Sequence, residues 1–205
     1  MVERQIRSRG VNDPRTLHAL SSVPRHLFVP TELAEQAYED HPVEIGHAQT
    51  VSQPYMVAWM TEALELRGTE RVLEVGTGSG YQTAVLAKLA AEVFTIERIP
   101  DLARRAQQTL DRLGFRNIHY RIGDGTLGLP DAAPFDAILV AAGGPAIPPA
   151  LKDQLADGGK IVMPVGGRGS QDLMLVTRRG ATVTEKALGG CVFVRLIGKH
   201  GWPEA

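Results

Sequence analysis

The chain has 205 residues, of which 43% are hydrophobic and 22% are charged, and its formal net charge is −1. This length suffices for one domain with a substantial core, and the composition excludes intrinsic disorder and fibrous structure. The balanced charge argues against a nucleic-acid partner, because proteins that bind phosphates carry a concentrated excess of Lys and Arg. We therefore expect a single domain over residues 1–205.

The amino-terminal segment, Met-Val-Glu-Arg-Gln-Ile-Arg-Ser-Arg, carries charges where a secretion signal needs an apolar run. No apolar stretch approaches the ~20 residues that span a membrane. These features predict a cytoplasmic protein without a membrane partner. Cys191 is the only cysteine, which excludes an intrachain disulfide and a multi-cysteine zinc site. Its strand-like surroundings favour a small core residue, and we expect no metal.

Two helix starts stand out in the first third of the chain. Asp13 before Pro14 is typical of a helix N-terminus, and that helix ends before Val23-Pro24. Pro54 begins a second helix, whose apolar residues recur at helical spacing up to Arg67-Gly68. We interpret residues 1–53 as a helical and loop extension of the domain.

From Arg71 onward, strand-like and helical patterns alternate. Strands are predicted over Arg71–Val75, Val93–Ile96, Asn117–Ile122, Ala137–Val140 and Lys160–Val165, with helices over Tyr81–Leu89, Pro100–Leu113 and about Pro149–Leu155. Three further strands, joined only by glycine-containing turns, are predicted over Leu173–Thr177, Thr182–Ala187 and Cys191–Ile197. This order indicates an α/β fold with a doubly wound, mostly parallel sheet, helices on both faces and antiparallel C-terminal strands. Ligands of such folds bind at the carboxyl ends of the strands.

A glycine-rich turn follows the first strand of this region. The run from Val72 to Tyr81 reads Val-Leu-Glu-Val-Gly-Thr-Gly-Ser-Gly-Tyr. The dinucleotide motif Gly-x-Gly-x-x-Gly is broken, because Tyr81 occupies its last position. The acid Glu74 stands two residues before Gly76. This pattern suits a ligand without phosphates whose amino-acid end carries an ammonium and a carboxylate, as S-adenosylmethionine does.

Acids also close the next two strands. Glu97 lies nineteen residues after Gly78, where a carboxylate can accept hydrogen bonds from the two hydroxyls of a ribose. Asp124 stands between Gly123 and Gly125, where it could accept from the adenine amino group. In isolation, each acid is more readily explained as a solvated or turn residue. Their coincidence at successive strand ends favours a nucleoside site.

The segment Gly46-His47-Ala48-Gln49-Thr50-Val51-Ser52-Gln53-Pro54 resembles the motif Gly-x-Gly-Gln-Thr-Ile-Ser-x-Pro of protein-L-isoaspartate O-methyltransferases. The resemblance continues through the glycine turn, Glu97-Arg98, Gly123 to Gly125 and the C-terminal Leu196 to Trp202, so it covers nearly the whole chain.

This resemblance implies the S-adenosylmethionine-dependent methyltransferase fold and transfer of a methyl group to the free α-carboxylate of L-isoaspartyl residues in damaged proteins and peptides. The ester then closes to a succinimide, and the cofactor leaves as S-adenosyl-L-homocysteine. Residues 1–53 are expected on the substrate side, and the resemblance suggests a monomer. The family pattern implies Ser52 as the catalytic residue, which could orient the substrate carboxylate; capping of the helix at Pro54 is a compatible role. The cofactor-binding residues expected are Val51, Gln53, Glu74, Gly76, Thr77, Gly78, Ser79, Glu97, Arg98, Gly123, Asp124 and Gly125.

Two positions depart from the family pattern. Ala48 replaces a glycine, which reduces backbone freedom in the motif loop, and Arg195 stands where the family commonly has proline. Arg195 could bind a substrate carboxylate or face solvent. The alternatives are a methyltransferase for another carboxylate or small molecule, a nicotinamide dehydrogenase, and a non-enzymatic binding module.

Overall fold

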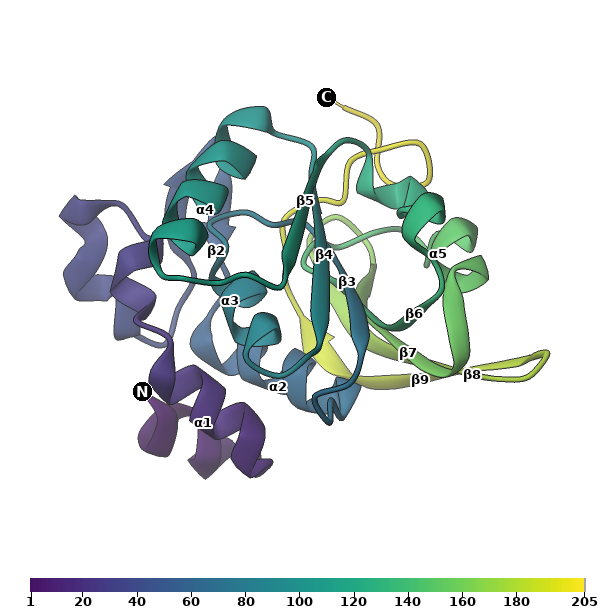
Figure 1. The fold of residues 1–205 in the computed structure, drawn as a ribbon, viewed down its shortest axis with the longest axis horizontal. Coiled ribbons are helices and arrows are strands. Elements are labelled where there is room, and N and C mark those ends of the chain that lie inside the picture. Colours follow the sequence, from purple (N-terminus) through teal and green to yellow (C-terminus); the bar gives the residue numbers. More distant parts are fainter. Residues whose placement is uncertain (205) are drawn as a thin grey trace.

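The computed structural model describes residues 1–204. Its main sheet has seven strands in the order β5-β4-β3-β6-β7-β8-β9 (Figure 1). The strands are β3 (Arg71–Val75), β4 (Glu92–Glu97), β5 (Ile118–Ile122), β6 (Phe135–Val140), β7 (Leu155–Gly166), β8 (Gln171–Arg179) and β9 (Thr182–Cys191). Neighbours from β5 to β7 pair in parallel, whereas β8 and β9 are antiparallel. The predicted fold class is confirmed.

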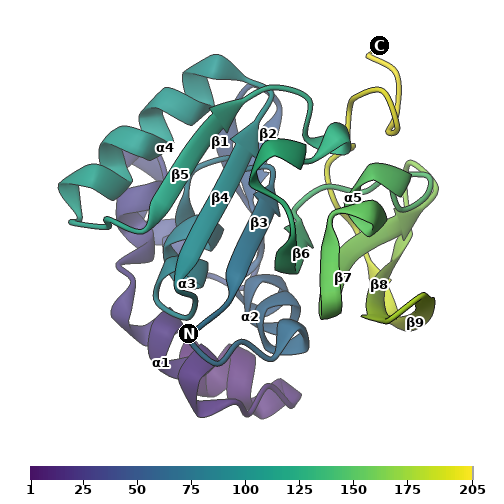
Figure 2. The same cartoon turned by 45° about the vertical axis from the view of Figure 1, so that its right-hand side comes forward.

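Helices cover both faces of this sheet. The helices are α1 (Pro14–Ser22), α2 (Pro54–Leu64), α3 (Tyr81–Ala87), α4 (Pro100–Arg112) and α5 (Pro149–Asp153). The helix α3 contacts β4, α4 contacts β4 and β5, and α5 contacts β7. Figure 2 shows α1 below α3 and α4, with α5 on the other side of β6. Short 3-10 turns lie at Arg7–Arg9, Arg25–Phe28, Thr31–Tyr38, Gly125–Leu127 and Pro130–Ala132, and a π-helical turn at Val2–Ile6.

Alternation along the strands divides the core into two clusters. In β3, Val72 belongs to the cluster that includes residues of α2 and α3, while Leu73 belongs to the cluster that includes Leu151 of α5. Both side chains are completely buried. Strands buried on both faces explain the continuous apolar runs that the sequence shows. Among residues 1–204, none of the helices combines the length and apolar character needed to cross a bilayer.

The first predicted helix has the expected boundaries. Asp13 accepts a hydrogen bond from the backbone N–H of Thr16 at 2.8 Å, which caps the first turn of α1. The helix ends at Ser22, directly before Val23-Pro24. The next helix, α2, begins at Pro54 but ends at Leu64, three residues earlier than expected, because Glu65 takes a left-handed conformation with φ of 54°.

Two features differ from the sequence-based expectation. The predicted strand Cys191–Ile197 is wrong: β9 ends at Cys191, and the chain then crosses the carboxyl end of the sheet. This crossing segment, residues 192–197, hydrogen-bonds to Gly143 rather than to an edge strand. The alternating apolar residues of this segment pack over the end of the core, which produces a strand-like pattern without a ladder.

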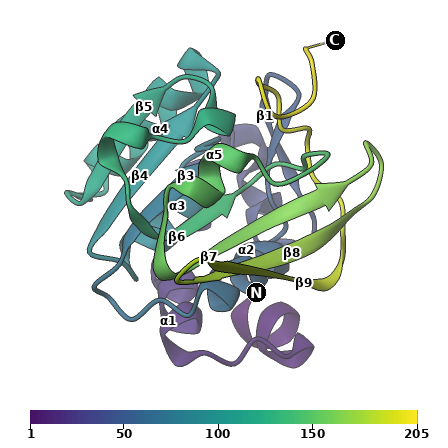
Figure 3. The same cartoon turned by 90° about the vertical axis from the view of Figure 1, so that its right-hand side faces the viewer.

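A small hairpin was also missed. Strands β1 (Val43–Gly46) and β2 (Gln49–Val51) pair as a separate two-stranded sheet. Figure 3 shows β1 and the yellow C-terminal segment at the same end of the molecule. The two turn residues, His47 and Ala48, have φ of 54° and 53°, as the twist of a two-residue hairpin requires. Neither residue is a glycine, so the usual sequence signal for such a turn is absent.

Candidate active site

A cavity with about 750 Å³ of empty space, including its opening to solvent, lies at the carboxyl ends of β3, β4 and β6. The strand order reverses at β3, so this is the crevice where the doubly wound fold predicts a ligand. Its walls come from the hairpin, the glycine turn, the strand ends and the C-terminal segment. The lining includes Val51, Ser52, Gly76, Thr77, Gly78, Ser79, Glu97, Arg98 and Gly125 from the predicted site.

The glycine turn forms the floor of the cavity. Gly76 and Gly78 have φ of 96° and 54°, conformations that side chains other than glycine rarely adopt. Gly80 does not line the cavity. A Cβ there would lie 3.0 Å from Leu110 of α4, so this glycine permits close packing. The first two glycines therefore serve the cavity and the third serves the core.

Glu97 lies at the end of β4 and is 6% exposed. One carboxylate oxygen accepts a hydrogen bond from the N–H of Gly78 at 2.9 Å, and the other accepts from Ile99 at 3.0 Å. Two carboxylate oxygens offer about four acceptor positions, so capacity remains for hydroxyl donors in the cavity. The carboxylate ties the glycine turn to the end of β4 while facing the ligand space.

Glu74 lies below the cavity rather than in its wall. The side chain is completely buried, and one oxygen accepts hydrogen bonds from the hydroxyls of Thr83 and Thr95. The hydroxyl of Thr95 also bonds that of Thr77, which does line the cavity. Burial raises the pKa of Glu74 to about 8, against hydrogen bonds that lower it. Direct cofactor contact by Glu74 stays a prediction, and the structure places it in a layer behind Thr77.

The turn that follows β5 contributes Gly125 to the cavity, whereas Gly123 and Asp124 do not line it. The Asp124 carboxylate accepts from Thr126 through one oxygen and from the backbone N–H of Lys199 through the other. These hydrogen bonds hold its pKa below the ordinary value despite partial burial, and they fasten the C-terminal segment. The adenine contact predicted for Asp124 stays a prediction.

Ser52 stands between the cavity and a second groove. It lines both spaces, as do Thr50, Ala141 and Val194. The first residue before α2 is Gln53, and no side chain caps that helix, so the capping role considered for Ser52 is not realised. The buried Arg25 donates a hydrogen bond to the Ser52 carbonyl at 2.8 Å, which holds the backbone of the motif loop.

Gln53 faces the second groove instead of the cavity. Its side-chain nitrogen donates to the carboxylate of Asp40 at 2.9 Å and to the Asp40 carbonyl. The groove wall includes the stacked rings of Tyr55 and Trp59, and Phe193 from the crossing segment. It is a groove with aromatic walls, and Ser52 belongs to its lining. Cofactor contact by Gln53 stays a prediction.

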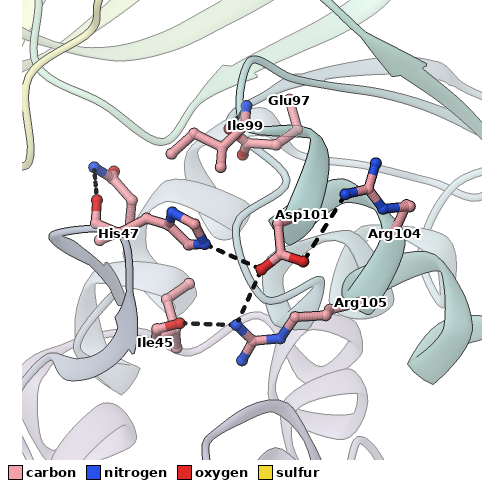
Figure 4. Close-up of polar contacts among 8 residues, drawn as sticks. Ile45, His47, Glu97, Ile99, Asp101, Arg104 and Arg105 are labelled. Atoms are coloured by element: carbon pink, nitrogen blue, oxygen red, sulfur yellow. Dashed lines mark hydrogen bonds and ion pairs between the residues drawn. The ribbon is translucent and has the colours of Figure 1, made fainter.

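An ion-pair cluster fastens the hairpin to α4, as Figure 4 shows. The carboxylate of Asp101 lies 3.0 Å from Nε2 of His47 and 3.8 Å from a guanidinium nitrogen of Arg105. Arg105 also donates to the carbonyl of Ile45 in β1. These contacts lower the pKa of Asp101, with the hydrogen bond from His47 as the largest cause. His47 thus has a structural partner and lies at the rim of the site.

The family model described as Protein-L-isoaspartate(D-aspartate) O-methyltransferase matches residues 1–201. The chain belongs to this family. "Protein-L-isoaspartate O-methyltransferase 1" of Syntrophobacter fumaroxidans is 60% identical over 202 residues, which are 98% of this chain and 94% of that relative. "Protein-L-isoaspartate O-methyltransferase" of Syntrophus aciditrophicus is 59% identical over 205 residues, 98% of this chain and 94% of the relative.

A solved structure of the same family agrees with the fold. A Plasmodium falciparum protein named for this methyltransferase activity, in complex with S-adenosyl-L-homocysteine, superposes with a TM-score of 0.82 at 27% identity. The match covers 93% of this chain and 94% of the other. The predicted family membership is therefore confirmed over essentially the whole length.

Several residues that line the cavity of this protein-L-isoaspartate O-methyltransferase family member were not predicted from the sequence. They are Gln49, Thr50, Val57, Val75, Gln82, Ile96, Ala141, Ala142, Val194, Leu196 and Ile197. Gln49 and Thr50 belong to the motif and could have been included. Ala141 and Ala142 follow the end of β6, where position in a parallel strand is the only signal. The crossing segment could not have been placed, because it was predicted as an edge strand.

Proposed function

We propose that this enzyme transfers a methyl group from S-adenosylmethionine to the free α-carboxylate of L-isoaspartyl residues in damaged proteins and peptides. The observation that carries the proposal is the position of Ser52, which lines both the cavity and the aromatic groove. A methyl donor in one space and a peptide carboxylate in the other would meet at this residue. Membership in the family supports the same reaction.

The cavity has the features that this cofactor requires. Its floor is a turn of positive-φ glycines, which leaves room for a ligand beside the backbone. Glu97 presents a carboxylate suited to ribose hydroxyls, and Val51 and Ile96 provide apolar walls. S-adenosylmethionine, when bound, supplies a methyl group on a positively charged sulfur and leaves as S-adenosyl-L-homocysteine.

Few catalytic groups are needed for this reaction. A carboxylate is ionised at neutral pH, so the nucleophilic oxygen needs no general base. The protein's contribution is to align that oxygen with the methyl carbon and to exclude competing water. Ser52 is placed to donate a hydrogen bond to the second carboxylate oxygen, and Arg25 fixes the loop that carries it.

We further propose that the chain acts as one domain and as a monomer in the cytoplasm, with residues 1–53 forming the substrate side. The support is that one chain supplies both spaces around Ser52. Residues of the amino-terminal region, including Arg9, Pro42 and Gln49, line the groove or the cavity.

The direct test is incorporation of labelled methyl into two otherwise identical peptides, one with L-isoaspartate and one with normal L-aspartate. We expect base-labile label on the isoaspartyl peptide alone. Label on neither peptide, in a protein that binds S-adenosylmethionine, would reject the substrate and point to another carboxylate or a small molecule.

Substitution Ser52→Ala is expected to lower kcat by about 10- to 100-fold, because a hydrogen bond to a charged group contributes about 1.5–3 kcal/mol. Affinity for S-adenosylmethionine should change little. Steady-state kinetics and titration calorimetry would separate the two effects. Unchanged turnover would remove the role assigned to Ser52.

Substitution Glu97→Ala should instead act mainly on cofactor affinity. It removes the acceptor for the N–H groups of Gly78 and Ile99 together with the proposed ribose contact. We expect cofactor affinity to fall by about 100-fold, which corresponds to about 2.7 kcal/mol. Glu92→Ala on the same strand, an exposed carboxylate paired with Arg71, is the matched control and should leave calorimetric affinity unchanged. Equal affinities of the two variants would contradict the assignment.

A further inference from the structure

A third hollow, with about 910 Å³ of empty space including its opening to solvent, lies beside the cofactor cavity, and its lining includes three arginines. Arg98 follows β4, Arg168 lies in the turn between β7 and β8, and Arg195 lies in the crossing segment. All three are exposed, and Arg98 and Arg195 also line the cofactor cavity. The hollow therefore adjoins the cofactor cavity. In a chain of net charge −1, this concentration of positive charge is local.

The backbone holds Arg195 at this position. Gly143 donates to the carbonyl of Val194 at 2.7 Å and accepts from the N–H of Leu196 at 2.9 Å. Val194 and Leu196 belong to the core cluster under the segment, whereas Arg195 between them is exposed. Extended backbone alternates its side chains, so residue 195 faces outward into the hollow.

The guanidinium groups have few competing partners. Arg98 pairs with Glu204 at 2.9 Å, but that glutamate is 80% exposed. Arg168 lies over the ring of Trp202, 5.3 Å from its centroid, in a contact that leaves its hydrogen-bond donors available. Within residues 1–204, neither Arg168 nor Arg195 forms an ion pair.

The carboxylate of Asp101, near the rim of this hollow, already has ion-pair partners. His47 belongs to the wall of the hollow, and its partner Asp101 is shared with Arg104 and Arg105 (Figure 4). The negative charge of Asp101 is thus balanced by arginines on its own helix. It does not neutralise the three arginines.

The two spaces that adjoin the cofactor cavity therefore differ in chemistry. The aromatic groove of Tyr55 and Trp59 meets the cavity at Ser52, whereas the basic hollow borders the cavity through Arg98 and Arg195. We infer that the basic hollow is a subsite for acidic side chains of the substrate, which selects isoaspartyl residues flanked by Asp or Glu. This inference rests on the proposed function and names a preference within its substrate class.

The expected preference is moderate and sensitive to salt. An exposed ion pair changes affinity by up to about fivefold, so two pairs give about a tenfold advantage. The advantage should appear in KM and not in kcat, because the contact is the same before and during transfer. It should shrink in about 0.5 M salt, where the screening length falls to a few ångströms.

The test compares isoaspartyl peptides of one core sequence whose flanking residues are Glu, Gln or Lys, placed before, after or on both sides of the isoaspartate. We expect kcat/KM for the best glutamate peptide to exceed that for its glutamine counterpart by about tenfold at low salt. In Arg168→Gln/Arg195→Gln this ratio should fall close to one. Arg116→Gln, at the amino end of β5 and away from the site, is the matched control and should keep the ratio.

The outcomes are distinguishable. Methylation of the glutamine peptide with no preference for glutamate would overturn this inference and leave the proposed function intact. A preference that persists in the double variant would also overturn it, since other residues would then recognise the acid. If no isoaspartyl peptide is methylated at any flank, the proposed function itself fails.

Discussion

Substitution of Arg25 by methionine is expected to lower both stability and turnover, although Arg25 touches neither the cofactor cavity nor the groove. The guanidinium is completely buried between the amino-terminal turns and the motif loop. It donates from Nε to the carbonyl of Ala37 and from a terminal nitrogen to the carbonyl of Ser52, and it lies 4.6 Å above the ring of Tyr81. One side chain thus joins three segments.

The magnitude follows from what methionine leaves behind. It fills the volume of the aliphatic stem but leaves the two carbonyl groups without their donor. A buried polar group that loses its partner costs about 1–3 kcal/mol, so we expect a loss of about 2–4 kcal/mol in unfolding free energy. Relief of the buried charge, whose desolvation lowers the pKa of Arg25, offsets part of the loss.

Arg25→Lys is the informative companion variant. It keeps a positive charge, but its single ammonium cannot reproduce the fork that reaches both carbonyls. Denaturant unfolding should place Arg25→Lys between the parent protein and Arg25→Met. In both variants kcat should fall while calorimetric affinity for S-adenosylmethionine stays near the parent value. A loss of stability with unchanged kcat would show that Arg25 is structural only and does not position Ser52.

The parallel part of the fold could be predicted well because strands that are buried on both faces appear in the sequence as continuous apolar runs. Arg71–Val75 was predicted to the residue, since its apolar run and the following glycines are local signals. The crossing segment was mispredicted because Val194 and Leu196 alternate as a strand does, while their partner Gly143 is distant in sequence. Pattern alone does not distinguish a ladder from a segment that packs over the end of a sheet.

The site could be predicted to the extent that its residues follow strand ends. Glu97 and the glycine turn lie where parallel topology brings them together. Asp124 obeys the same rule, and its oxygens also accept from Thr126 and Lys199, partners that only coordinates reveal. Its contact with adenine stays a prediction. Arg25 carried no signal at all, because nothing near it in sequence indicates a buried guanidinium.

Glu74 provides the second large effect, a loss of stability with rising pH. Its carboxyl is completely buried, and one of its oxygens has no hydrogen-bond partner among residues 1–204. Burial disfavours the ionised form and raises the folded-state pKa from 4.5 to about 8. The nearby charge of Glu97 acts in the same direction, whereas the hydroxyls of Thr83 and Thr95 oppose it.

The sign of the effect follows from proton linkage. Between pH 4.5 and about 8 the folded protein holds the Glu74 proton and the unfolded chain releases it, so folding takes up a proton. Stability must therefore fall as pH rises through this window, by at most about 1.4 kcal/mol per pH unit, and level off above it. We expect a total loss of a few kcal/mol, superposed on smaller contributions from other groups.

Glu74→Gln isolates this contribution, because glutamine resembles the neutral acid in shape and keeps a carbonyl oxygen that can accept from Thr83 and Thr95. Urea unfolding at pH 6 and pH 9 should show a steep decline for the parent protein and a shallow one for the variant. The stability advantage of the parent protein over Glu74→Gln at pH 6 should therefore narrow or reverse at pH 9. Parallel declines would mean that Glu74 is ionised in the folded protein at neutral pH, with the buried charge stabilised more strongly than its hydroxyl partners indicate.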